Sequence, residues 1–447
     1  MSDTTRIDTS RWEALPEPGK EVLGILVGGG PAPGINGVIS ALTIEAISRG
    51  CRVLGIEDGY SGLVRGRTDR VHELTLDDVS RIHLAGGSIL GTSRANPTGD
   101  PEDLKRVVET LKKLGVTLLA SIGGDDTAFS SASVLKAAGD SIRVAHVPKT
   151  IDNDLPLPGD MPTFGYQTAR HEGVRVLRHL AVDAQTTGRW YMAVTMGRKA
   201  GHLALGIGKA AGATLTLIPE EFRAPLPLRV LGDQIETTIL KRRAMGRNHG
   251  TLVLAEGLIE KLDPEDVSGL KEAGHDEHGH LQLAEIRLGE IVRREVVGRF
   301  TARGDSLGIV TKDIGYELRC ADPIPFDMEY TRDLGFGTAL FLLSGGTGAL
   351  MSIQRRNLVP IPFEEILDPE TGRTAVRLVD LESQSHVIAR EYMIRLEATD
   401  IEVDAATNKL AKEAGLSVDV FRKRFRYLVE PNPYRVPVPR AVDIRFP

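Results

Sequence analysis

Strand-like and helix-like segments alternate along most of this 447-residue chain, and this alternation limits the possible folds more than any other feature. Val22 to Val27 is an apolar run of strand length, and Ile35 to Arg49 then shows a helical pattern that Gly50 ends. Cys51 to Ile56 again has the character of a strand. The alternation predicts an α/β protein with doubly wound, mostly parallel sheets that bind ligands at the carboxyl ends of their strands.

The most clearly defined helix of the sequence begins after Asp100, which is a good N-cap and is followed by Pro101 at the first helical position. An apolar stripe runs along it before Gly115 ends the helix. The stripe consists of Leu104, Val107, Val108, Leu111 and Leu114. Further strands are expected at 116–122, 142–147, 189–195, 214–218 and 250–255.

The length of the chain favours two domains with separate cores over one. Residues 1–20 have no periodic pattern and are expected to form an N-terminal arm. We predict a first α/β domain over 21–165, completed by a segment near 323–360. The second should cover 166–322 and be completed by part of 361–447.

Composition excludes several classes of function. With 41% hydrophobic and 26% charged residues and no low-complexity tract, the chain should be globular and ordered. A net charge of −6 gives no general attraction for nucleic acid or an anionic membrane, and the longest apolar runs are only of strand length. Two cysteines without metal-type spacing, Cys51 and Cys320, and the lack of an apolar leader favour the reducing cytoplasm.

Glycines dominate the loop that follows the first predicted strand, from Gly28 to Asn36. Glycine allows backbone to approach a ligand closely, and N–H groups at the start of a helix favour an anion. The loop can therefore cradle a phosphate. The alternative is that its glycines serve only to pack a tight α/β turn, and the loop matches neither a P-loop nor a GxGxxG fingerprint.

Two carboxylates, Asp125 and Asp126, follow Gly123 and Gly124 at the end of another predicted strand, ahead of a helix expected to begin near Thr127. Adjacent acidic side chains in such a place suit coordination of Mg²⁺. The alternative interpretation makes Asp126 a plain helix cap.

A third loop, Pro148 to Asp154, brings a lysine, a hydroxyl and two carboxylates together directly after an apolar strand. A turn by itself would not need Lys149. A carboxylate beside a substrate hydroxyl can take its proton during phosphoryl transfer, and a lysine can offset charge on the phosphoryl oxygens. Either Asp152 or Asp154 could be that base.

Three later strand ends carry polar residues that suit a sugar phosphate, since arginine binds phosphate and glutamate binds hydroxyls. Taken singly, each could be an ordinary surface group. These segments are Thr195 to Arg198, Leu254 to Gly257 and Tyr316 to Arg319. A loop with His275, His278 and His280 could bind a metal, but the glycines and charges nearby favour a solvated surface insertion.

In their order along the chain, these segments resemble the phosphofructokinase family, especially its pyrophosphate-dependent members, from about Leu23 to Ile361. The family phosphorylates fructose 6-phosphate. The resemblance implies the phosphofructokinase fold with two Rossmann-like domains, a donor domain first and a sugar-phosphate domain second. The motifs that carry it are the glycine loop, Gly91-Thr92-Ser93-Arg94, GGDD, PKTIDND, Phe164 to Ala169, MGR, AEG and the segment ending at Arg319.

The resemblance implies that Asp152 activates the 1-hydroxyl of the sugar, supported by Lys149, Thr150 and Asp154, and that Asp125 binds Mg²⁺. The residues expected to contact the donor phosphates are Gly29, Gly30, Arg94 and Asp126. Those expected to hold the sugar phosphate are Arg189, Met196, Gly197, Arg198, Glu256, Tyr316 and Arg319. Arg189 would reach the substrate of a neighbouring subunit, so a homo-oligomer, a dimer or tetramer, is expected.

Two positions indicate the donor. ATP-using bacterial relatives usually have glycine where Asp126 and Lys149 stand in this sequence. Asp126 would narrow the space for a nucleotide and set a negative charge near its α-phosphate, whereas Lys149 would favour a compact polyanion. Because some ATP-using relatives also have the lysine, Asp126 is the stronger indicator. The expected reaction is reversible transfer from pyrophosphate to fructose 6-phosphate, giving fructose 1,6-bisphosphate and phosphate.

Two departures from the family pattern concern the sugar site and the glycine loop. Many relatives have a histidine at Tyr316 and a basic residue at Val310, for which Lys312 could substitute. ATP-using relatives often have an aspartate at Pro31.

The alternatives to a pyrophosphate-dependent enzyme are an ATP-dependent enzyme and a non-catalytic regulatory subunit, although a regulatory subunit would be expected to lose its catalytic acids.

Overall fold

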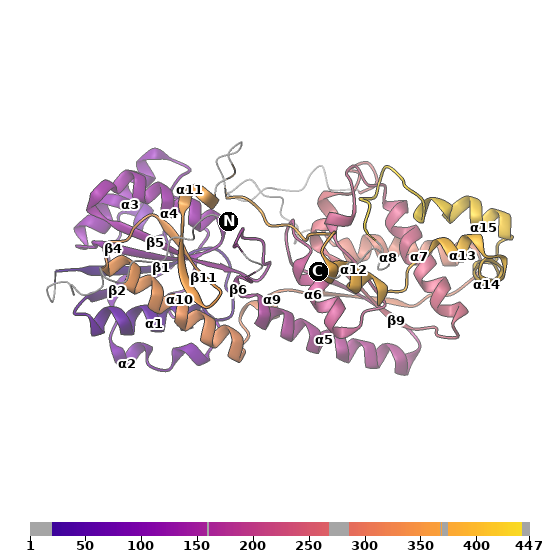
Figure 1. Ribbon diagram of the computed structural model, residues 1–447, viewed down its shortest axis with the longest axis horizontal. Helices are drawn as coiled ribbons and strands as arrows, with labels where there is room; N and C mark the ends of the chain where they lie inside the picture. Colours follow the sequence, from indigo (N-terminus) through magenta and orange to yellow (C-terminus); the bar gives the residue numbers. More distant parts are fainter. Residues whose placement is uncertain (1–19, 159–160, 268–285, 367, 369–373, 440–447) are drawn as a thin grey trace. The chain divides into compact units, whose positions relative to one another are not determined.

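The structure is a computed structural model that describes residues 20–158, 161–267, 286–366, 368 and 374–439. The chain divides into two compact units (Figure 1). Unit 1 takes its described residues from Met1–Ala169 and Tyr316–Arg377, and unit 2 takes its own from Arg170–Asp276, Leu281–Gly315 and Leu378–Pro447. The predicted histidine loop at 275–280 lies outside the described residues.

Unit 1 follows the predicted alternation of strands and helices. Its strands are β1 (Val22–Val27), β2 (Arg52–Ile56), β3 (Val71–Glu73), β4 (Leu118–Gly123), β5 (Arg143–Thr150), β6 (Phe164–Gly165), β11 (Ala349–Gln354) and β12 (Asn357–Pro362). Its helices are α1 (Ile35–Ser48), α2 (Leu76–Val79), α3 (Pro101–Lys113), α4 (Asp125–Ala138), α9 (Tyr316–Arg319), α10 (Pro325–Leu343) and α11 (Phe363–Ile366), with the start of α5 (Tyr166–Thr187).

Within the described part of the chain, the strands of unit 1 form one eight-stranded sheet in the order β12-β11-β5-β4-β1-β2-β3, with β6 beside β5. The central strands are parallel, and only β3 and β12 run antiparallel to their neighbours. Leu23 stands opposite both Val53 and Leu118, so β1 lies at the centre of the sheet.

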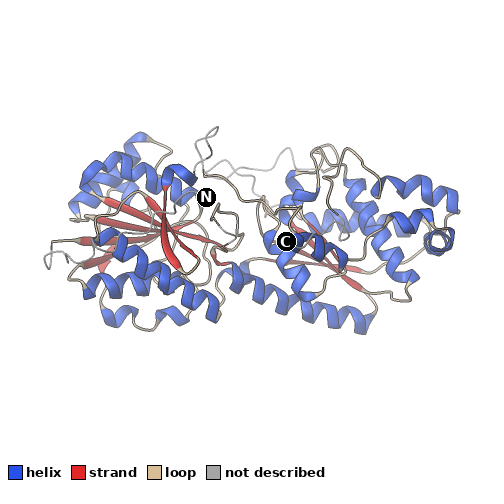
Figure 2. Cartoon of the chain, viewed as in Figure 1, coloured by secondary structure: helices blue, strands red, loops and turns tan. Residues whose placement is uncertain are grey.

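Helices cover both faces of this sheet (Figure 2), because the side chains of β1 are apolar on both sides. Leu23, Ile25 and Val27 face a core that includes residues of α1 and α10. Leu26 points the other way, into a core that includes residues of α3 and α4. The structure thus confirms the predicted doubly wound α/β fold in this unit.

Unit 2 is built on the same plan with a smaller sheet. Its strands are β7 (Trp190–Thr195), β8 (Leu215–Leu217), β9 (Gly250–Ala255) and β10 (Ile309–Ile314). Its helices are the rest of α5, α6 (His202–Ala211), α7 (Leu228–Ala244), α8 (Leu288–Ala302), α12 (Gln384–Glu391), α13 (Ala398–Glu402), α14 (Asp404–Ala414) and α15 (Val418–Phe425). Its described strands form a parallel sheet in the order β10-β7-β9-β8.

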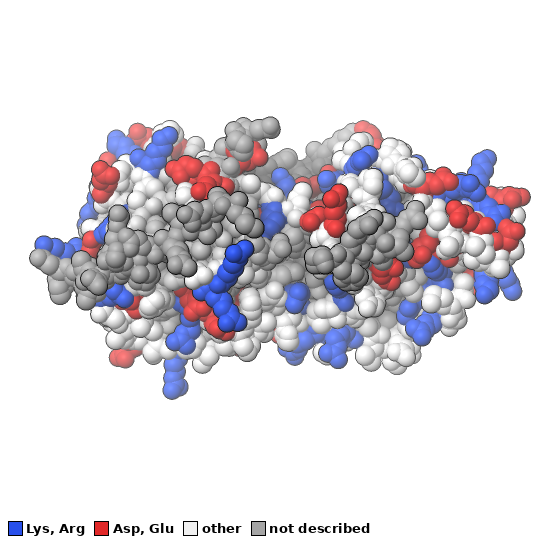
Figure 3. Space-filling view, in the orientation of Figure 1, with Lys and Arg blue, Asp and Glu red and all other residues white. Residues whose placement is uncertain are grey.

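The C-terminal helices complete the core of unit 2. Trp190 of β7 is fully buried and shares one apolar cluster with Leu410 of α14 and with Phe421 and Phe425 of α15. The part of the chain beyond residue 385, which matched no motif, therefore supplies amphipathic helices that pack against the sheet domain. None of the described helices is long and apolar enough to span a membrane. On the face shown in Figure 3, acidic and basic side chains are interspersed.

A buried ion pair attaches this C-terminal part to the sheet. Arg395 donates from both terminal nitrogens to Glu221, at 2.7 and 2.9 Å, and also to the carbonyl of Thr216. Both charged side chains are nearly inaccessible, with 5% and 1% exposure. Burial alone would raise the pKa of Glu221, but Arg395 and His386 together hold that pKa well below its usual range.

Arg395→Met is expected to lower the free energy of unfolding of unit 2 by about 3–5 kcal/mol, because it leaves the Glu221 charge buried without its partner. Urea unfolding followed by the fluorescence of Trp190, in a Trp12→Phe background, measures this. Combining Arg395→Met with Glu221→Leu should recover much of the loss, since no lone charge then remains. A loss below about 1 kcal/mol in the single variant would contradict the structural role of the pair.

Candidate active site

The first set of candidate residues lies where the strand order of unit 1 reverses. The connection from β1 runs through α1 to β2, whereas that from β4 runs through α4 to β5 on the other side. Adjacent parallel strands whose connections diverge leave a crevice at their carboxyl ends, which is where doubly wound sheets bind ligands. The Gly28 N–H donates to the Ile122 carbonyl at 2.8 Å, so the glycine loop and the GGDD loop start side by side.

The glycine loop needs at least two of its glycines for physical reasons. A Cβ atom at Gly28 would lie 2.4 Å from the hydroxyl of Thr127, so only glycine lets the first turn of α4 come this close. Gly29 has φ of +80°, a conformation that glycine adopts without strain. The interpretation that these glycines serve packing is therefore correct for Gly28, and it does not compete with a role of the loop in binding.

The Gly91-Thr92-Ser93-Arg94 segment lies along the same loop. The Gly29 N–H donates to the Ser93 carbonyl at 2.8 Å, and the Thr92 hydroxyl donates to the Gly29 carbonyl at 2.6 Å. Arg94 follows directly and is exposed. The structure thus places Gly29, Gly30 and the Arg94 segment together, although they are about 60 residues apart in the sequence.

Asp125 and Asp126 occupy the first turn of α4, and both are half-buried. The N-cap of this helix is Gly124, without a side-chain cap. The alternative interpretation of Asp126 as a helix cap is therefore wrong, because the helix begins two residues earlier than the sequence suggested. Both carboxylates stand at the carboxyl end of β4, next to the glycine loop.

Lys149 is only 4% exposed, and its side chain lies over the glycine loop. Its Nζ donates to the carbonyl of Gly30 and lies 3.2 Å from the position that a Cβ atom of Gly29 would take. A buried ammonium group beside backbone N–H groups and a helix start favours a compact, highly charged anion. This arrangement supports the predicted contact of Lys149 with the donor.

The Asp152 loop continues from β5, so it lies at the same edge of the sheet. The Asp152 N–H donates to the Thr150 hydroxyl at 3.0 Å, so Thr150 holds the backbone at Asp152. Asn153 has φ of +59°, and its side-chain oxygen accepts a hydrogen bond from the Thr163 N–H at 3.0 Å. Asp152 and Asp154 flank this left-handed residue and are half-buried.

Sequence reasoning missed His146, which is fully buried beneath the GGDD loop. One ring nitrogen contacts the Gly123 carbonyl at 3.0 Å and the other the Ser121 hydroxyl at 2.8 Å. Burial, aided by the nearby Lys149 charge, lowers the pKa of His146 to about 3, so the ring is neutral at neutral pH. A histidine in an otherwise apolar strand was the available signal.

Tyr316 and Arg319 group with unit 1, whereas the predicted domain boundary after residue 322 would put them with the sugar-phosphate domain. The Arg319 guanidinium carbon lies 3.4 Å from the position of a Cβ atom at Gly30 and 5.1 Å from the centre of the Tyr316 ring. Tyr316 itself is 66% exposed. Arg319 is thus a second cation beside the glycine loop.

The second set of candidates lies at the carboxyl ends of β7 and β9, which are parallel neighbours in the sheet of unit 2. Glu256, directly after β9, accepts hydrogen bonds from the N–H groups of Gly197 and Arg198 at 3.1 and 2.9 Å. Met196 packs against Gly315, where a Cβ atom would lie 2.5 Å from its side chain. The structure therefore brings Met196, Gly197, Arg198 and Glu256 together.

Arg189 does not join this group. It is exposed and precedes β7, so it lies at the amino end of the strand whose carboxyl end carries Met196 to Arg198. A strand of this length separates its ends by roughly 20 Å. Within one chain Arg189 therefore has no access to the Glu256 group, and its predicted role in the site of a neighbouring subunit remains a prediction.

The acidic residues of the candidate site suit Mg²⁺, but they do not form a site in which protein ligands alone surround a metal ion. No cluster of three or more histidine, cysteine or acidic side chains that could hold a metal ion occurs among the residues that the structure describes. Mg²⁺ usually binds one or two carboxylates and completes its shell with water and substrate phosphates. Asp125 and Asp126 beside the glycine loop match that pattern.

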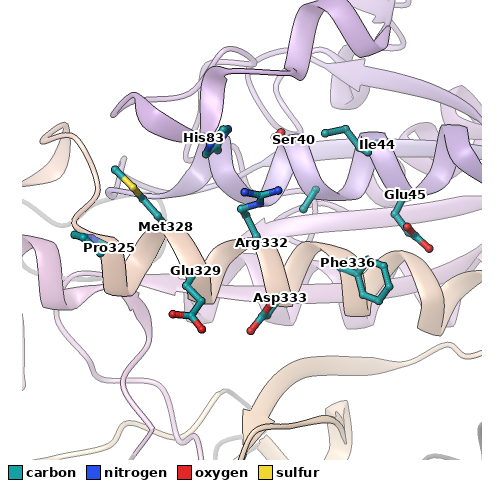
Figure 4. Close-up of a pocket in the computed structure, with 11 residues that line it drawn as sticks. Ser40, Ile44, Glu45, His83, Pro325, Met328, Glu329, Arg332, Asp333 and Phe336 are labelled. Atoms are coloured by element: carbon teal, nitrogen blue, oxygen red, sulfur yellow. The ribbon is translucent and has the colours of Figure 1, made fainter.

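A separate hollow of about 590 Å³ lies between α1 and α10 (Figure 4). Ser40, Ile44 and Glu45 line it from α1, and Arg332 and Phe336 from α10. The residues that line it include none of the candidate site residues. It is therefore distinct from the crevice at the carboxyl ends of the strands.

Together, the glycine loop, the start of α4, Lys149 and the Asp152 loop form a candidate site whose chemistry suits a phosphate-containing donor of an α/β enzyme. Comparison with known proteins identifies the family more closely. The sequence model described as Phosphofructokinase matches residues 22–342. The chain belongs to the phosphofructokinase family, as its resemblance indicated.

Two curated relatives are both named pyrophosphate–fructose 6-phosphate 1-phosphotransferase. The one from Naegleria fowleri is 52% identical over 421 residues, covering 91% of this chain and 96% of the relative. The one from Thermotoga maritima is 51% identical over 415 residues, covering 92% and 99%. A solved pyrophosphate-dependent phosphofructokinase from Nitrosospira multiformis matches with a TM-score of 0.64 at 16% identity, over 88% of this chain and 92% of that one, and so supports the fold alone.

Proposed function

We propose that this protein is a pyrophosphate-dependent phosphofructokinase, which transfers a phosphoryl group reversibly from pyrophosphate to the 1-hydroxyl of fructose 6-phosphate. The observation that carries the donor assignment is Asp126 in the first turn of α4, beside the glycine loop against which Lys149 is buried. The two curated relatives that are more than 50% identical to this chain bear the name of this activity. The enzyme is thus a phosphotransferase.

Unit 1 is proposed to bind the donor and unit 2 the sugar phosphate. The donor phosphates would contact Gly29, Gly30, Arg94 and Lys149, with Asp126 excluding a nucleotide by its bulk and charge. The acceptor would contact Met196, Gly197, Arg198 and Glu256, and the family resemblance also assigns Tyr316 and Arg319 to it. Arg319 beside Gly30 is well placed to neutralise charge on the phosphoryl group as well.

In the proposed reaction, Asp152 accepts the proton of the sugar 1-hydroxyl as that oxygen attacks the terminal phosphorus of pyrophosphate. The new P–O bond forms while the bridging P–O bond breaks, and orthophosphate leaves with the bridging oxygen. Lys149 and Arg198 offset charge on the phosphates, and Thr150 fixes the backbone at Asp152. The reaction exchanges the phosphoanhydride bond of pyrophosphate for a phosphate ester, and with this simple donor both directions are proposed to be accessible.

Mg²⁺ is the proposed cofactor, held by Asp125 with Asp154 in support. When bound, it would supply positive charge that neutralises and orients the pyrophosphate oxygens.

We also propose a homo-oligomer, because Arg189 requires a neighbouring subunit to reach a sugar phosphate. The two cysteines, Cys51 and Cys320, are both free thiols, which supports a reducing cytoplasm as the place of the reaction.

The preferred phosphoryl donor distinguishes the proposed function from that of an ATP-dependent kinase of the same family. Purified protein is expected to have a kcat/KM for pyrophosphate at least about 100-fold above that for ATP, a difference of roughly 2.7 kcal/mol. Steady-state rates with each donor, at saturating fructose 6-phosphate and Mg²⁺, measure this. Higher activity with ATP would overturn the interpretation of Asp126, and no activity with either donor would favour a regulatory subunit.

A further inference from the structure

Arg377 binds the loop that carries the proposed base. Its guanidinium donates to the Asn153 carbonyl at 3.1 Å and to the Asn153 side-chain oxygen at 2.5 Å. It also donates to the carbonyls of Leu157 and Met161, at 3.3 and 2.9 Å. The backbone N–H of Arg377 donates to the Asp154 carbonyl at 2.7 Å. One residue therefore holds both ends of the loop.

The contacts with Asn153 matter most, because this residue lies between the two acidic side chains. Its φ of +59° lies in the left-handed region, which asparagine adopts more readily than other non-glycine residues but still uncommonly, so contacts with its carbonyl and side chain help to maintain it. A change of φ at Asn153 would turn Asp152 and Asp154 relative to each other. The fork of the Arg377 guanidinium fixes the carbonyl and the side chain of Asn153 at once.

The same short segment also reaches the other acidic loop. Thr374, only 8% exposed, donates its hydroxyl to the carbonyl of Asp125 at 3.1 Å. Thr374 and Arg377 therefore contact both the loop of the proposed metal ligand and the loop of the proposed base. They lie beyond residue 342, where the match to the family model ends, so the motif comparison could not have indicated them.

We propose that Thr374 and Arg377 are positioning residues that hold the Asp125 and Asp152 loops in the geometry needed for phosphoryl transfer. This inference rests on the proposed function for its catalytic consequence. Its structural part, that Arg377 maintains the left-handed turn at Asn153, stands without any substrate. Since a misplacement of about 1 Å can cost on the order of 100-fold in rate, the effect should appear mainly in kcat.

The test compares Arg377→Met with Arg143→Met. Arg143 is a matched control, because it also donates to a carbonyl, that of Leu342 at 2.8 Å, but from the amino end of β5. Arg377→Met is expected to lower kcat about 10- to 100-fold with KM values for both substrates within about 3-fold. Arg143→Met should keep kcat within about 3-fold. Arg377→Lys, which keeps the charge without the fork, should be intermediate.

Hydrogen exchange provides a readout that needs no activity. The Thr163 N–H donates to the Asn153 side chain, so Arg377→Met should speed exchange in the peptide containing Thr163, whereas Arg143→Met should not. Thr374→Val, which removes one neutral hydrogen bond, should lower kcat about 2- to 10-fold. If Arg377→Met does not fold, the kcat and the hydrogen exchange of Arg377→Lys and Thr374→Val test the positioning role instead.

Three results would overturn the proposal: Arg377 variants within 3-fold of wild type in kcat, equal losses in Arg377→Met and Arg143→Met, or unchanged exchange at Thr163. All variants are compared with wild type using whichever donor the wild type prefers. A failure of the donor assignment therefore shows in the wild-type assay. A failure of the positioning role shows only in the ratio of the variant's kcat to that of the wild type and in the hydrogen exchange at Thr163.

Discussion

Asp152→Asn is expected to keep the fold and to lower kcat by about 10²- to 10⁴-fold, the usual contribution of a positioned general base. The amide has the same shape as the carboxylate but cannot accept the proton of the sugar hydroxyl. The N–H of residue 152 still donates to Thr150, so the loop should retain its conformation. Steady-state kinetics with pyrophosphate and fructose 6-phosphate, together with circular dichroism, check both parts.

Asp100→Asn is the matched control for this substitution. Asp100 caps α3 through the Glu102 N–H, and asparagine caps equally well, so stability and kcat should stay near those of wild type. If Asp152→Asn kept kcat within about 10-fold, Asp152 would not be the base, and Asp154, two residues further on, would be the next residue to test.

Asp126→Gly with Lys149→Gly is expected to weaken the use of pyrophosphate and to admit ATP. Loss of a charge-assisted contact from Lys149 should lower kcat/KM for pyrophosphate about 10- to 100-fold. Removing Asp126 from the first turn of α4 takes away a carboxylate that would repel the α-phosphate of a nucleotide. Measuring kcat/KM for both donors across the two single variants and the double variant tests this.

The single variants separate the two roles. Lys149→Gly alone should only weaken the use of pyrophosphate, because Asp126 still obstructs the nucleotide. Since Lys149 also donates to the Gly30 carbonyl, Lys149→Met serves as a control that keeps the bulk of the side chain without its charge. If Lys149→Gly alone changed the preferred donor to ATP, the roles assigned to Asp126 and Lys149 would be reversed.

Local patterns predicted the elements well where they depend on neighbours in the sequence. Asp100 and Pro101 do begin a helix, and the run from Val22 to Val27 is a strand buried on both faces. The start of α4 was less well predicted: Gly124 carries no side-chain capping signal, so the sequence suggested a start near Thr127. His146, Thr374 and Arg377 have no local pattern, since their partners lie elsewhere in the chain.

The sequence by itself determined the fold class and the family, and it predicted which loops carry the chemistry, because hydrophobic periodicity and short motifs are local properties. Only the tertiary structure decided which of these loops meet. The order of strands brings the loops after β1, β4 and β5 to one edge of unit 1, and it separates Arg189 from Arg198 by the length of β7. Strand order depends on long-range packing of whole faces, and so does the position of Arg377 on the Asp152 loop.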